Sequence, residues 1–223
     1  MNPSTATIGS EGRARASAWW RPAPGARRGL AVAGAVAWLI AIAVGIRTVS
    51  TYATAPGPSG PAPRRWPQAS RLTLRSAGPT IVMFVHPRCA CSRASLSELN
   101  LIMNDARARA AAIVEFVRPD GVEAGWERTD IWSAALRIPD TTVLTDDDGE
   151  EARRFGAETS GDTRVYDAAG ALLFAGGITD ARGHAGDNAG RRAVLDLLHG
   201  GQARPQMHTV YGCLLHSPPP GAP

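Results

Sequence analysis

Residues 80–99 constrain the fold of this chain more than any other segment. They open with the apolar run 81–85, whose length and composition predict a buried strand. A polar turn follows, and then two of the chain's three cysteines, Cys89 and Cys91. Apolar residues then recur at spacings of three and four, which predicts a helix over residues 92–112. Two thiols are therefore expected where a strand is followed by a helix N-terminus.

This location changes the chemistry of a cysteine. Unpaired backbone N–H groups and the helix dipole stabilise negative charge at a helix N-terminus, and so lower the pKa of a thiol there. The spacing and location of Cys89 and Cys91 therefore indicate a redox or metal-binding site. The alternative is a pair of small buried apolar side chains in an ordinary turn.

The chain beyond residue 112 alternates predicted strands and helices, which indicates an α/β domain over residues 76–200. A strand–helix–strand order requires parallel pairing through a right-handed crossover. Residues 168–170 predict the turn of a hairpin. The predicted strands are 113–118, 141–144, 163–167 and 171–175, and the predicted helices are 126–136, 150–155 and 188–198.

At these residues the chain resembles the thioredoxin superfamily. In that family a buried strand leads through a short turn to a nucleophilic cysteine at the start of the next helix, with a second cysteine three residues later. Cys89 matches the nucleophile position, whereas Ser92 takes the second position and the nearest thiol is Cys91. The family's cis-proline segment corresponds to residues 158–163, which hold no proline. The resemblance implies a thioredoxin-like fold over residues 76–200, with a mixed central sheet flanked by helices.

A narrower resemblance is carried by the segments HPRCACS (86–92), GGITDARGHAGDNAG (176–190) and YGC (211–213). They are similar to segments of membrane-anchored bacterial redoxin-like proteins of the RedB group, a resemblance that implies no settled activity. In the thioredoxin-like fold, the loop after the last strand approaches the cysteine turn. The resemblance therefore implies that His184 lies near Cys89.

The most apolar part of the sequence lies near its N-terminus. Residues 29–46 are 18 uncharged and mostly apolar residues, a length near the lower limit for crossing a hydrocarbon core about 30 Å thick. We predict a single N-terminal transmembrane helix over residues 29–47, preceded by a disordered basic tail over residues 1–28. Residues 53–55 resemble a signal-peptidase site, so cleavage after Ala55 is the alternative to an uncleaved anchor.

Charge predicts the direction of this helix. Five arginines and one acid precede the apolar run, and only Arg47 follows it before the proline-rich stretch. The positive-inside rule therefore places the N-terminus in the cytoplasm and the main domain across the membrane. The chain has no lysine and much arginine and alanine, which is typical of a GC-rich bacterial genome. We expect a single-pass protein of the bacterial inner membrane whose domain lies in the oxidising periplasm.

Two further segments flank the domain. Residues 48–75 include APGPSGPAPRRWP, and proline at this density predicts a semi-rigid, extended spacer. Residues 201–223 form a tail that carries Cys213. This third cysteine can fold back on the domain, pair with another chain or stay unpaired, and the sequence leaves the pairing open.

Charge and motifs exclude several classes of ligand. Residues 1–75 hold ten arginines and one acid, whereas residues 76–223 hold fourteen arginines and nineteen acids, so the domain offers no basic surface to nucleic acid. The DDDG run at 146–149 lacks the spacing and distal glutamate of a calcium loop, and predicts a solvated turn that caps the next helix. The glycine-rich stretch 183–190 lacks the lysine of a phosphate-binding loop. We therefore expect no cofactor.

The leading hypothesis is a thiol–disulfide oxidoreductase that acts on protein thiols and disulfides in the periplasm. Cys89 is the predicted nucleophile, and the positive charge of Arg88 or Arg93 favours its thiolate. Either Cys91 or Cys213 is the resolving thiol. A disulfide between Cys89 and Cys91 closes a small strained ring, which favours the oxidation or isomerisation of clients over their reduction.

Two histidines are further candidates for the site, and the sequence allows two other functions. His86 precedes the cysteine turn and is a candidate for proton transfer, as is His184. Alternatively, Cys89, Cys91 and His86 suit copper(I) or zinc, which would make the protein a metal-binding or delivery module. In a third hypothesis the domain is a thioredoxin-like scaffold whose cysteines form a structural or intermolecular bond.

Overall fold

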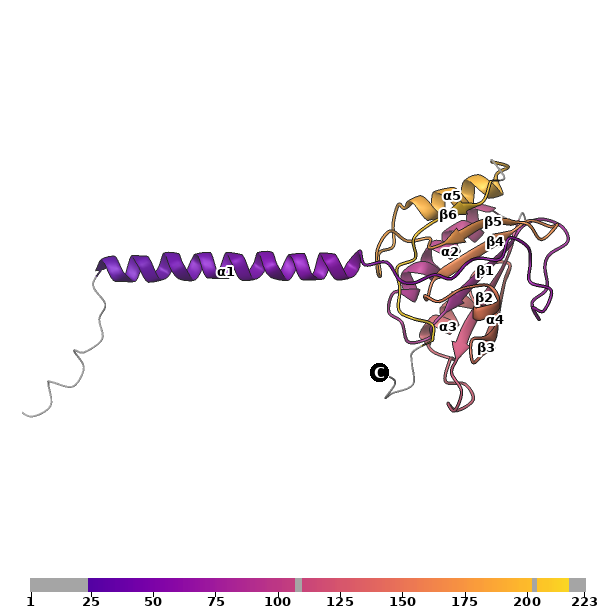
Figure 1. Ribbon diagram of the computed structural model, residues 1–223, viewed down its shortest axis with the longest axis horizontal. Helices are drawn as coiled ribbons and strands as arrows, with labels where there is room; N and C mark the ends of the chain where they lie inside the picture. The colour runs from indigo at the N-terminus through magenta and orange to yellow at the C-terminus, as the bar shows by residue number, and fades with distance from the viewer. Residues whose placement is uncertain (1–23, 107–109, 202–203, 217–223) are drawn as a thin grey trace, which may run out of the picture. The chain divides into compact units, whose positions relative to one another are not determined.

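A computed structural model describes residues 24–106, 110–201 and 204–216 of the chain (Figure 1). The chain divides into two compact units, residues 1–49 and 50–223. The described part of the first unit belongs to a single helix, α1 (Pro24–Ala53), whose last turn belongs to the second unit. The second unit contains a sheet and its flanking helices.

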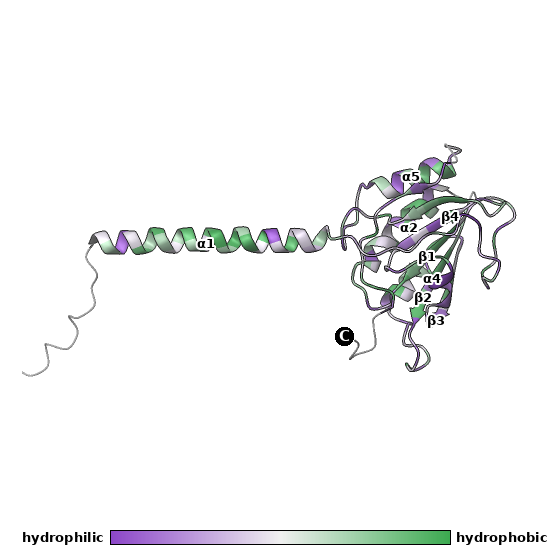
Figure 2. Ribbon diagram, in the orientation of Figure 1, coloured by the Kyte–Doolittle hydropathy of each residue, from purple (hydrophilic) through white to green (hydrophobic). Residues whose placement is uncertain are grey.

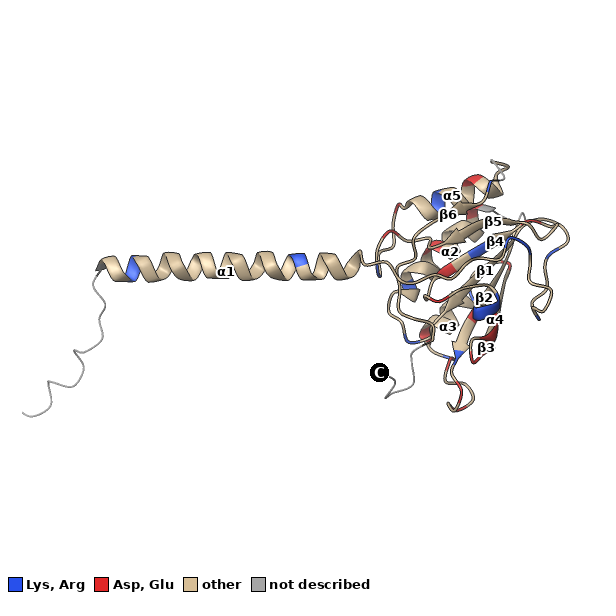
Figure 3. Cartoon of the chain, viewed as in Figure 1, with Lys and Arg blue, Asp and Glu red and all other residues tan. Residues whose placement is uncertain are grey.

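By length and composition, α1 is long and apolar enough to cross a membrane over Gly25–Ala53. Figure 2 shows its hydrophobic character, and the charged residues that Figure 3 marks on it are basic. The helix extends beyond the predicted residues 29–47. Polar residues continue it toward Ala53, and the Thr48 and Thr54 hydroxyls find acceptors in carbonyls one turn earlier, each at 2.9 Å.

Six strands form one mixed sheet in the order β3–β2–β1–β4–β5–β6. The first three are parallel to one another, β4 and β5 run antiparallel to their neighbours, and β6 is parallel to β5. The strands are β1 (Thr80–Val85), β2 (Ala111–Arg118), β3 (Thr141–Asp147), β4 (Asp162–Tyr166), β5 (Leu172–Gly176) and β6 (Gln206–Met207). This confirms the predicted thioredoxin-like fold with its mixed central sheet.

Helices cover both faces of the sheet. Ile81, Met83 and Val85 of β1 contribute to one apolar cluster, and Val82 and Phe84 contribute to the other. The first cluster includes residues of α2 (Ser92–Ala106), α3 (Asp130–Ala135) and α5 (Ala189–Leu198), and the second includes a residue of α4 (Glu150–Arg154). Because both faces are covered, β1 is a continuous apolar run rather than an alternating one.

Two predicted helices are shorter in the structure. α2 ends at Ala106 and β2 begins at Ala111, so the predicted helix over residues 92–112 was too long. The first alanines of β2 pair with β1, and this pairing overrides the helix propensity of alanine. The predicted helix over residues 126–136 begins only at Asp130, because turns occupy the residues before it.

Residues 57–75 pack against the domain, so the prediction of an extended spacer is wrong for this part of the chain. The Trp66 ring lies edge-on to the rings of Phe155 and Tyr166, with centroids 5.1 and 5.3 Å away. Leu72 is buried in the second apolar cluster. The proline content indicated a spacer, but the aromatic and aliphatic side chains between the prolines bury apolar surface on the sheet.

Three buried carboxylates, those of Glu115, Asp146 and Glu151, lie on the side of the sheet that α4 covers. Asp146 accepts the backbone N–H groups of Glu151 and the next residue at 2.9 Å each, which confirms the predicted helix cap, but its side chain is buried and not solvated as predicted. Glu115 accepts from Arg71 at 2.8 Å through Oε2, whereas its buried Oε1 has no partner within the described residues. Burial raises the pKa of Glu115 to about 8, and the Arg71 guanidinium only partly opposes this.

Glu115→Gln is therefore expected to stabilise the fold most at alkaline pH. A carboxyl whose pKa is higher in the folded state than its ordinary value of 4.5 binds its proton more tightly when folded. The free energy of unfolding of the wild type then falls as pH rises from 4.5 to about 8, and the variant lacks this contribution.

Thermal unfolding of the full-length protein across that pH range measures the difference. Asp147→Asn, at a side chain that is 70% exposed, is the control. An advantage of Glu115→Gln that does not grow with pH would contradict the expectation.

Candidate functional site

The cysteine turn, residues 86–91, connects β1 to α2. It places Cys89 and Cys91 between the strand and the helix N-terminus, as predicted. The backbone N–H of Cys89 donates to the His86 carbonyl at 3.1 Å, and that of Ser92 donates to the Cys89 carbonyl at 3.1 Å. The Cys89 residue is 3% exposed, whereas Cys91 is half-buried. The nucleophile predicted from the sequence is therefore covered by other parts of the chain.

Cys213 comes from the C-terminal segment, which we define as residues 208–216. This segment runs antiparallel to residues 158–160, and the Ser160 N–H donates to the Cys213 carbonyl at 2.8 Å. The backbone pairing brings Cys213 to the cysteine turn although 124 positions separate it from Cys89 in the sequence. Of the three fates that the sequence left open for this thiol, the structure shows it folded back on the domain.

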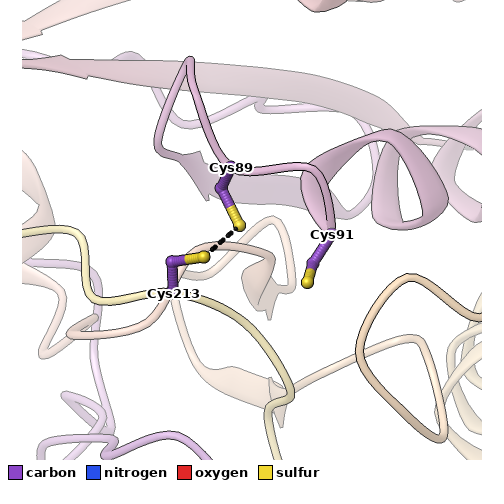
Figure 4. A group of neighbouring side chains, drawn as sticks. All are labelled: Cys89, Cys91 and Cys213. Atoms are coloured by element: carbon purple, nitrogen blue, oxygen red, sulfur yellow. Dashed lines mark hydrogen bonds between the residues drawn. The ribbon is translucent and has the colours of Figure 1, made fainter. Parts of the chain in front are cut away.

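The Sγ atoms of Cys89 and Cys213 are 2.8 Å apart (Figure 4). This distance exceeds the bond of about 2.05 Å in a disulfide, so both residues are free thiols in contact. Cys91 lies beside them, and its Sγ completes a group in which the three sulfur atoms are all within 4.8 Å of one another. Three thiols from two distant parts of the chain therefore share one site.

The surroundings make Cys89 the most acidic of the three thiols. Burial by itself raises its pKa, but hydrogen bonds from Cys213, from the Ser92 side chain and from the Cys91 backbone outweigh burial and lower the pKa. Burial and the interaction with Cys89 raise the pKa of Cys213 to about 12. Burial and the charge of Cys89 also raise the pKa of Cys91. Once Cys89 ionises, Cys213 keeps its proton and donates a hydrogen bond to the Cys89 thiolate.

Two serines connect the cysteine turn to the segment before β4. The Oγ atoms of Ser92 and Ser160 share a hydrogen bond of 2.7 Å, and the His86 N–H donates to the Ser160 hydroxyl at 2.8 Å. Ser160 lies in the segment 158–163, which the resemblance aligned with the cis-proline of the family. No cis peptide bond occurs in the described residues. A pair of hydroxyl groups therefore braces the turn at this place.

Arg88 and Arg93, which the sequence suggested as charges that favour the Cys89 thiolate, have other partners. The Arg88 guanidinium carbon lies 4.6 Å from the centre of the Trp126 ring, and Arg93 forms an exposed ion pair with Asp130. Hydrogen bonds lower the pKa of Cys89 instead. The predicted direction of the shift is confirmed, and a backbone hydrogen bond at the start of the helix is among its causes, whereas the charges of Arg88 and Arg93 are not among the main ones.

Arg182 is a cation of the site that the sequence analysis did not single out. Its guanidinium donates to the carbonyl of Gly212, the residue before Cys213. Its positive charge lowers the pKa of Cys91 and of Cys213, although burial has the larger, opposite effect. The only sequence signal for it was its position within residues 176–190, because no local pattern marks a loop arginine that acts on a cysteine thirty residues later.

Neither histidine is a member of the group of three clustered thiols within the described residues. The His86 Nδ1 accepts the Arg88 N–H at 3.2 Å, and its ring stands edge-on to Trp126 at a centroid distance of 5.7 Å. Burial and the Arg88 charge lower the pKa of His86, so its ring is neutral at neutral pH. His184 is exposed, and no hydrogen bond joins it to the cysteines in the part of the chain that the structure describes. Proton transfer by either histidine stays a prediction.

The group with the geometry to hold a metal ion consists of the three cysteines. His86, which the sequence suggested as a ligand, is not a member of it within the described residues. Three thiolates are soft ligands, and they fit copper(I) or zinc better than the hard cations calcium and magnesium.

Comparisons with solved structures concern the fold. An uncharacterized conserved protein from Geobacillus kaustophilus aligns with a TM-score of 0.54 at 19% identity, over 76% of this chain and 95% of that one. A hypothetical protein from Sinorhizobium meliloti aligns with a TM-score of 0.52 at 19% identity, over 72% and 93%. A secreted disulfide oxidoreductase of Mycobacterium tuberculosis has a TM-score of 0.38 at 16% identity, over 56% and 83%. No protein-family model and no curated protein matches the chain. The narrower RedB resemblance stays a prediction.

Ser92→Ala is expected to raise the pKa of Cys89, because the variant removes one of the hydrogen bonds that stabilise the thiolate. A hydrogen bond to the charged form of a group favours that form, so the pKa of the Cys89 thiol should rise when the bond is lost. The pH dependence of alkylation at Cys89, followed by mass spectrometry of the full-length protein, measures the shift. Ser97→Ala, in an exposed part of α2, is the control. Equal pKa values in wild type and Ser92→Ala would refute the assigned cause.

Proposed function

We propose that this protein is a thiol–disulfide oxidoreductase whose reacting pair is Cys89 and Cys213. The observation that carries the proposal is the 2.8 Å contact between a buried thiol with a lowered pKa and a second thiol with a raised pKa. Thiol–disulfide exchange needs a thiolate that attacks and a second thiol close enough to resolve the mixed disulfide. Cys89 and Cys213 meet both requirements.

Exchange with a client disulfide takes two steps. The Cys89 thiolate attacks one sulfur of the client, the client S–S bond breaks, and one client sulfur leaves with the electron pair as a thiolate. Cys213 then gives up its proton and attacks the Cys89 sulfur, which displaces the second client thiolate and forms the Cys89–Cys213 disulfide. The client gains two electrons and this protein loses two. The reverse sequence oxidises a client dithiol.

The choice of Cys213 as the partner of Cys89 affects the expected direction of electron flow. The expectation that the protein oxidises or isomerises its clients depended on a strained Cys89–Cys91 ring. With Cys213 as the partner, the disulfide closes a long loop instead, and this reason no longer applies. The reduction potential of the Cys89–Cys213 pair, compared with that of its compartment, sets the direction.

We further propose that the protein is anchored in a bacterial inner membrane, with its N-terminus in the cytoplasm and its domain in the periplasm. The length and apolar composition of α1 support the anchor. The excess of arginine before the apolar run supports the direction. An oxidising periplasm suits a protein that exchanges disulfides, and protein thiols and disulfides there are the proposed partners.

Binding of a soft metal is a second candidate function, and the clustering of three thiols favours it. Metal–sulfur bonds of about 2.3 Å place tetrahedral ligands about 3.8 Å apart, which the 4.8 Å limit of the group accommodates. The 2.8 Å contact between Cys89 and Cys213 would have to widen. Copper(I) and zinc both suit such a set of thiolates.

Single cysteine variants test the oxidoreductase. In redox buffers, the full-length wild type is expected to show one reversible two-electron couple. Cys89→Ser should abolish this couple, because it removes the thiol whose pKa is lowered. Cys213→Ser should lose the Cys89–Cys213 disulfide and accumulate more mixed disulfide at Cys89 than the wild type does, whereas Cys91→Ser should retain the couple. A couple that survives in Cys213→Ser and disappears in Cys91→Ser would contradict the assigned pair, and a wild type without any couple would contradict the function.

Metal titration tests the second candidate. If the site is a metal centre, the reduced full-length protein retains about one equivalent of copper(I) or zinc. Each of the three cysteine variants should then lose affinity, and His86→Ala should keep it, since His86 lies outside the thiol group. Wild-type protein that exchanges disulfides but releases both metals on desalting would exclude this function.

A further inference from the structure

Two thiols compete for Cys89. Cys91 is two positions away in the same turn, whereas Cys213 is 124 positions away, and yet the Cys213 Sγ makes the contact of 2.8 Å. A distant segment loses more chain entropy than a local one when it is brought to the site. The preference for Cys213 therefore depends on whatever holds the C-terminal segment in place.

The C-terminal segment has little regular structure of its own. It contains no helix, and its one bridge pairs with the residues before β4. Its backbone is tied at His208, whose N–H donates to β5 at 2.9 Å, and at Val210, whose carbonyl accepts the Gly57 N–H at 2.8 Å. Between these ties and Cys213 lies Gly212, whose carbonyl accepts from the Arg182 guanidinium. This side-chain hydrogen bond acts on the peptide unit that leads into Cys213.

Gly212 is held tightly on its other side. A Cβ at this position would lie 2.1 Å from the Ser160 carbonyl oxygen, so only glycine fits against residues 159–160. The Gly212–Cys213 peptide unit is therefore fixed between a close backbone contact and a hydrogen bond from a charged donor. Such charge-assisted bonds are stronger than those between neutral groups.

Arg182 is itself fixed in place. Its backbone N–H donates to the Ala53 carbonyl at 2.8 Å, and its guanidinium carbon lies 5.1 Å from the centre of the Tyr52 ring. Both partners belong to the same compact unit as the thiols, residues 50–223. A planar guanidinium held on an aromatic face keeps its donor direction better than a flexible ammonium would.

The charge of Arg182 acts on the two competing thiols alike. It lowers the pKa of Cys213 and of Cys91, in opposition to burial and to the negative charge of Cys89. Cys213 must lose its proton before it attacks the Cys89 sulfur, so the charge favours that step. The Arg182 charge acts on both Cys91 and Cys213, so the charge alone does not distinguish between them. The hydrogen bond from Arg182 to the Gly212 carbonyl does, because it acts only on the segment that carries Cys213.

We propose that Arg182, through its hydrogen bond to the Gly212 carbonyl, makes Cys213 rather than Cys91 the disulfide partner of Cys89. Arg182 is a positioning residue, since no hydrogen bond from it to a sulfur occurs in the described residues. The inference rests on the proposed function, because it concerns which of two thiols resolves the mixed disulfide.

Disulfide mapping at redox equilibrium tests the inference. Full-length wild type and Arg182→Gln are equilibrated in glutathione buffer, trapped by acid and alkylation, and analysed for the ratio of Cys89–Cys213 to Cys89–Cys91 by mass spectrometry. The ratio should fall about tenfold in Arg182→Gln, the effect of one hydrogen bond from a charged donor. A ratio within about twofold of the wild-type value would overturn the inference.

Two further variants separate position from charge. Arg182→Lys keeps the charge with a different donor geometry, so it should retain the wild-type pH dependence of the resolving step while recovering only part of the disulfide ratio. Arg192→Gln removes an arginine of α5 that is 56% exposed and pairs with Asp187, and it should leave both quantities unchanged. An equal loss in Arg192→Gln would show that general loss of charge, not Arg182, is responsible.

A variant with an intact Arg182 keeps the test decisive if Arg182→Gln does not fold. Tyr52→Leu removes the ring on which the guanidinium lies, and should shift the disulfide ratio in the same direction by a smaller factor. An unchanged ratio in a folded Tyr52→Leu protein would also count against the inference. A wild type that forms no internal disulfide would refute the proposed function, whereas a Cys89–Cys213 disulfide that is independent of Arg182 would refute only this inference.

Discussion

The site depends on the backbone pairing between the C-terminal segment and residues 158–160. This pairing consists of main-chain hydrogen bonds, among them the 2.8 Å bond from the Ser160 N–H to the Cys213 carbonyl. The pairing therefore requires little of the sequence. Its main requirement is glycine at position 212, where the C-terminal segment and residues 159–160 approach too closely for a side chain. Without the pairing, two thiols would remain in the cysteine turn and the third would be on a free tail.

The segment that receives this pairing is itself anchored to the cysteine turn. The Ser160 hydroxyl binds Ser92 and the His86 N–H, and the Gly161 N–H donates to the Phe84 carbonyl at 2.8 Å. The same short stretch thus contacts the turn on one side and the C-terminal segment on the other. These hydrogen bonds are short and mostly buried. Residues 158–161 therefore hold the cysteine turn and the C-terminal segment, and with them the three thiols, in fixed relative positions.

The local part of the site was predictable from the sequence, and the long-range part was not. The pattern of apolar residues next to Cys89 in the sequence predicts a strand, a turn and a helix. The structure confirms these elements from β1 to the start of α2. The position of Cys213 depends on pairing between segments about fifty residues apart, for which no periodic pattern exists. Arg182 was missed for the same reason, since its partner Gly212 lies on another loop.

The predictions that rested on the composition of a segment were wrong where individual side chains or backbone pairing determined its structure. The prolines before residue 68 indicated a spacer, yet Trp66 and Leu72 bury apolar surface against the sheet. The alanines at the start of β2 indicated a longer helix, but hydrogen bonds with β1 made them a strand. In both cases a partner distant in sequence decided the structure.

The separation of Cys89 and Cys213 has a consequence for the whole domain. A bond between them would make a covalent ring that contains α2, β2 and every later element up to the C-terminal segment. Chain-entropy arguments give a ring of 100 residues about 4.7 kcal/mol of stabilisation against unfolding. By thermodynamic linkage, the free energy with which the ring stabilises the fold equals the free energy with which the fold stabilises the ring. The tendency of the two thiols to form this ring in the folded protein is then coupled to the extra resistance to unfolding of the oxidised form, and a mutation shifts the electron balance at the thiols when it weakens the packing of one redox form more than that of the other.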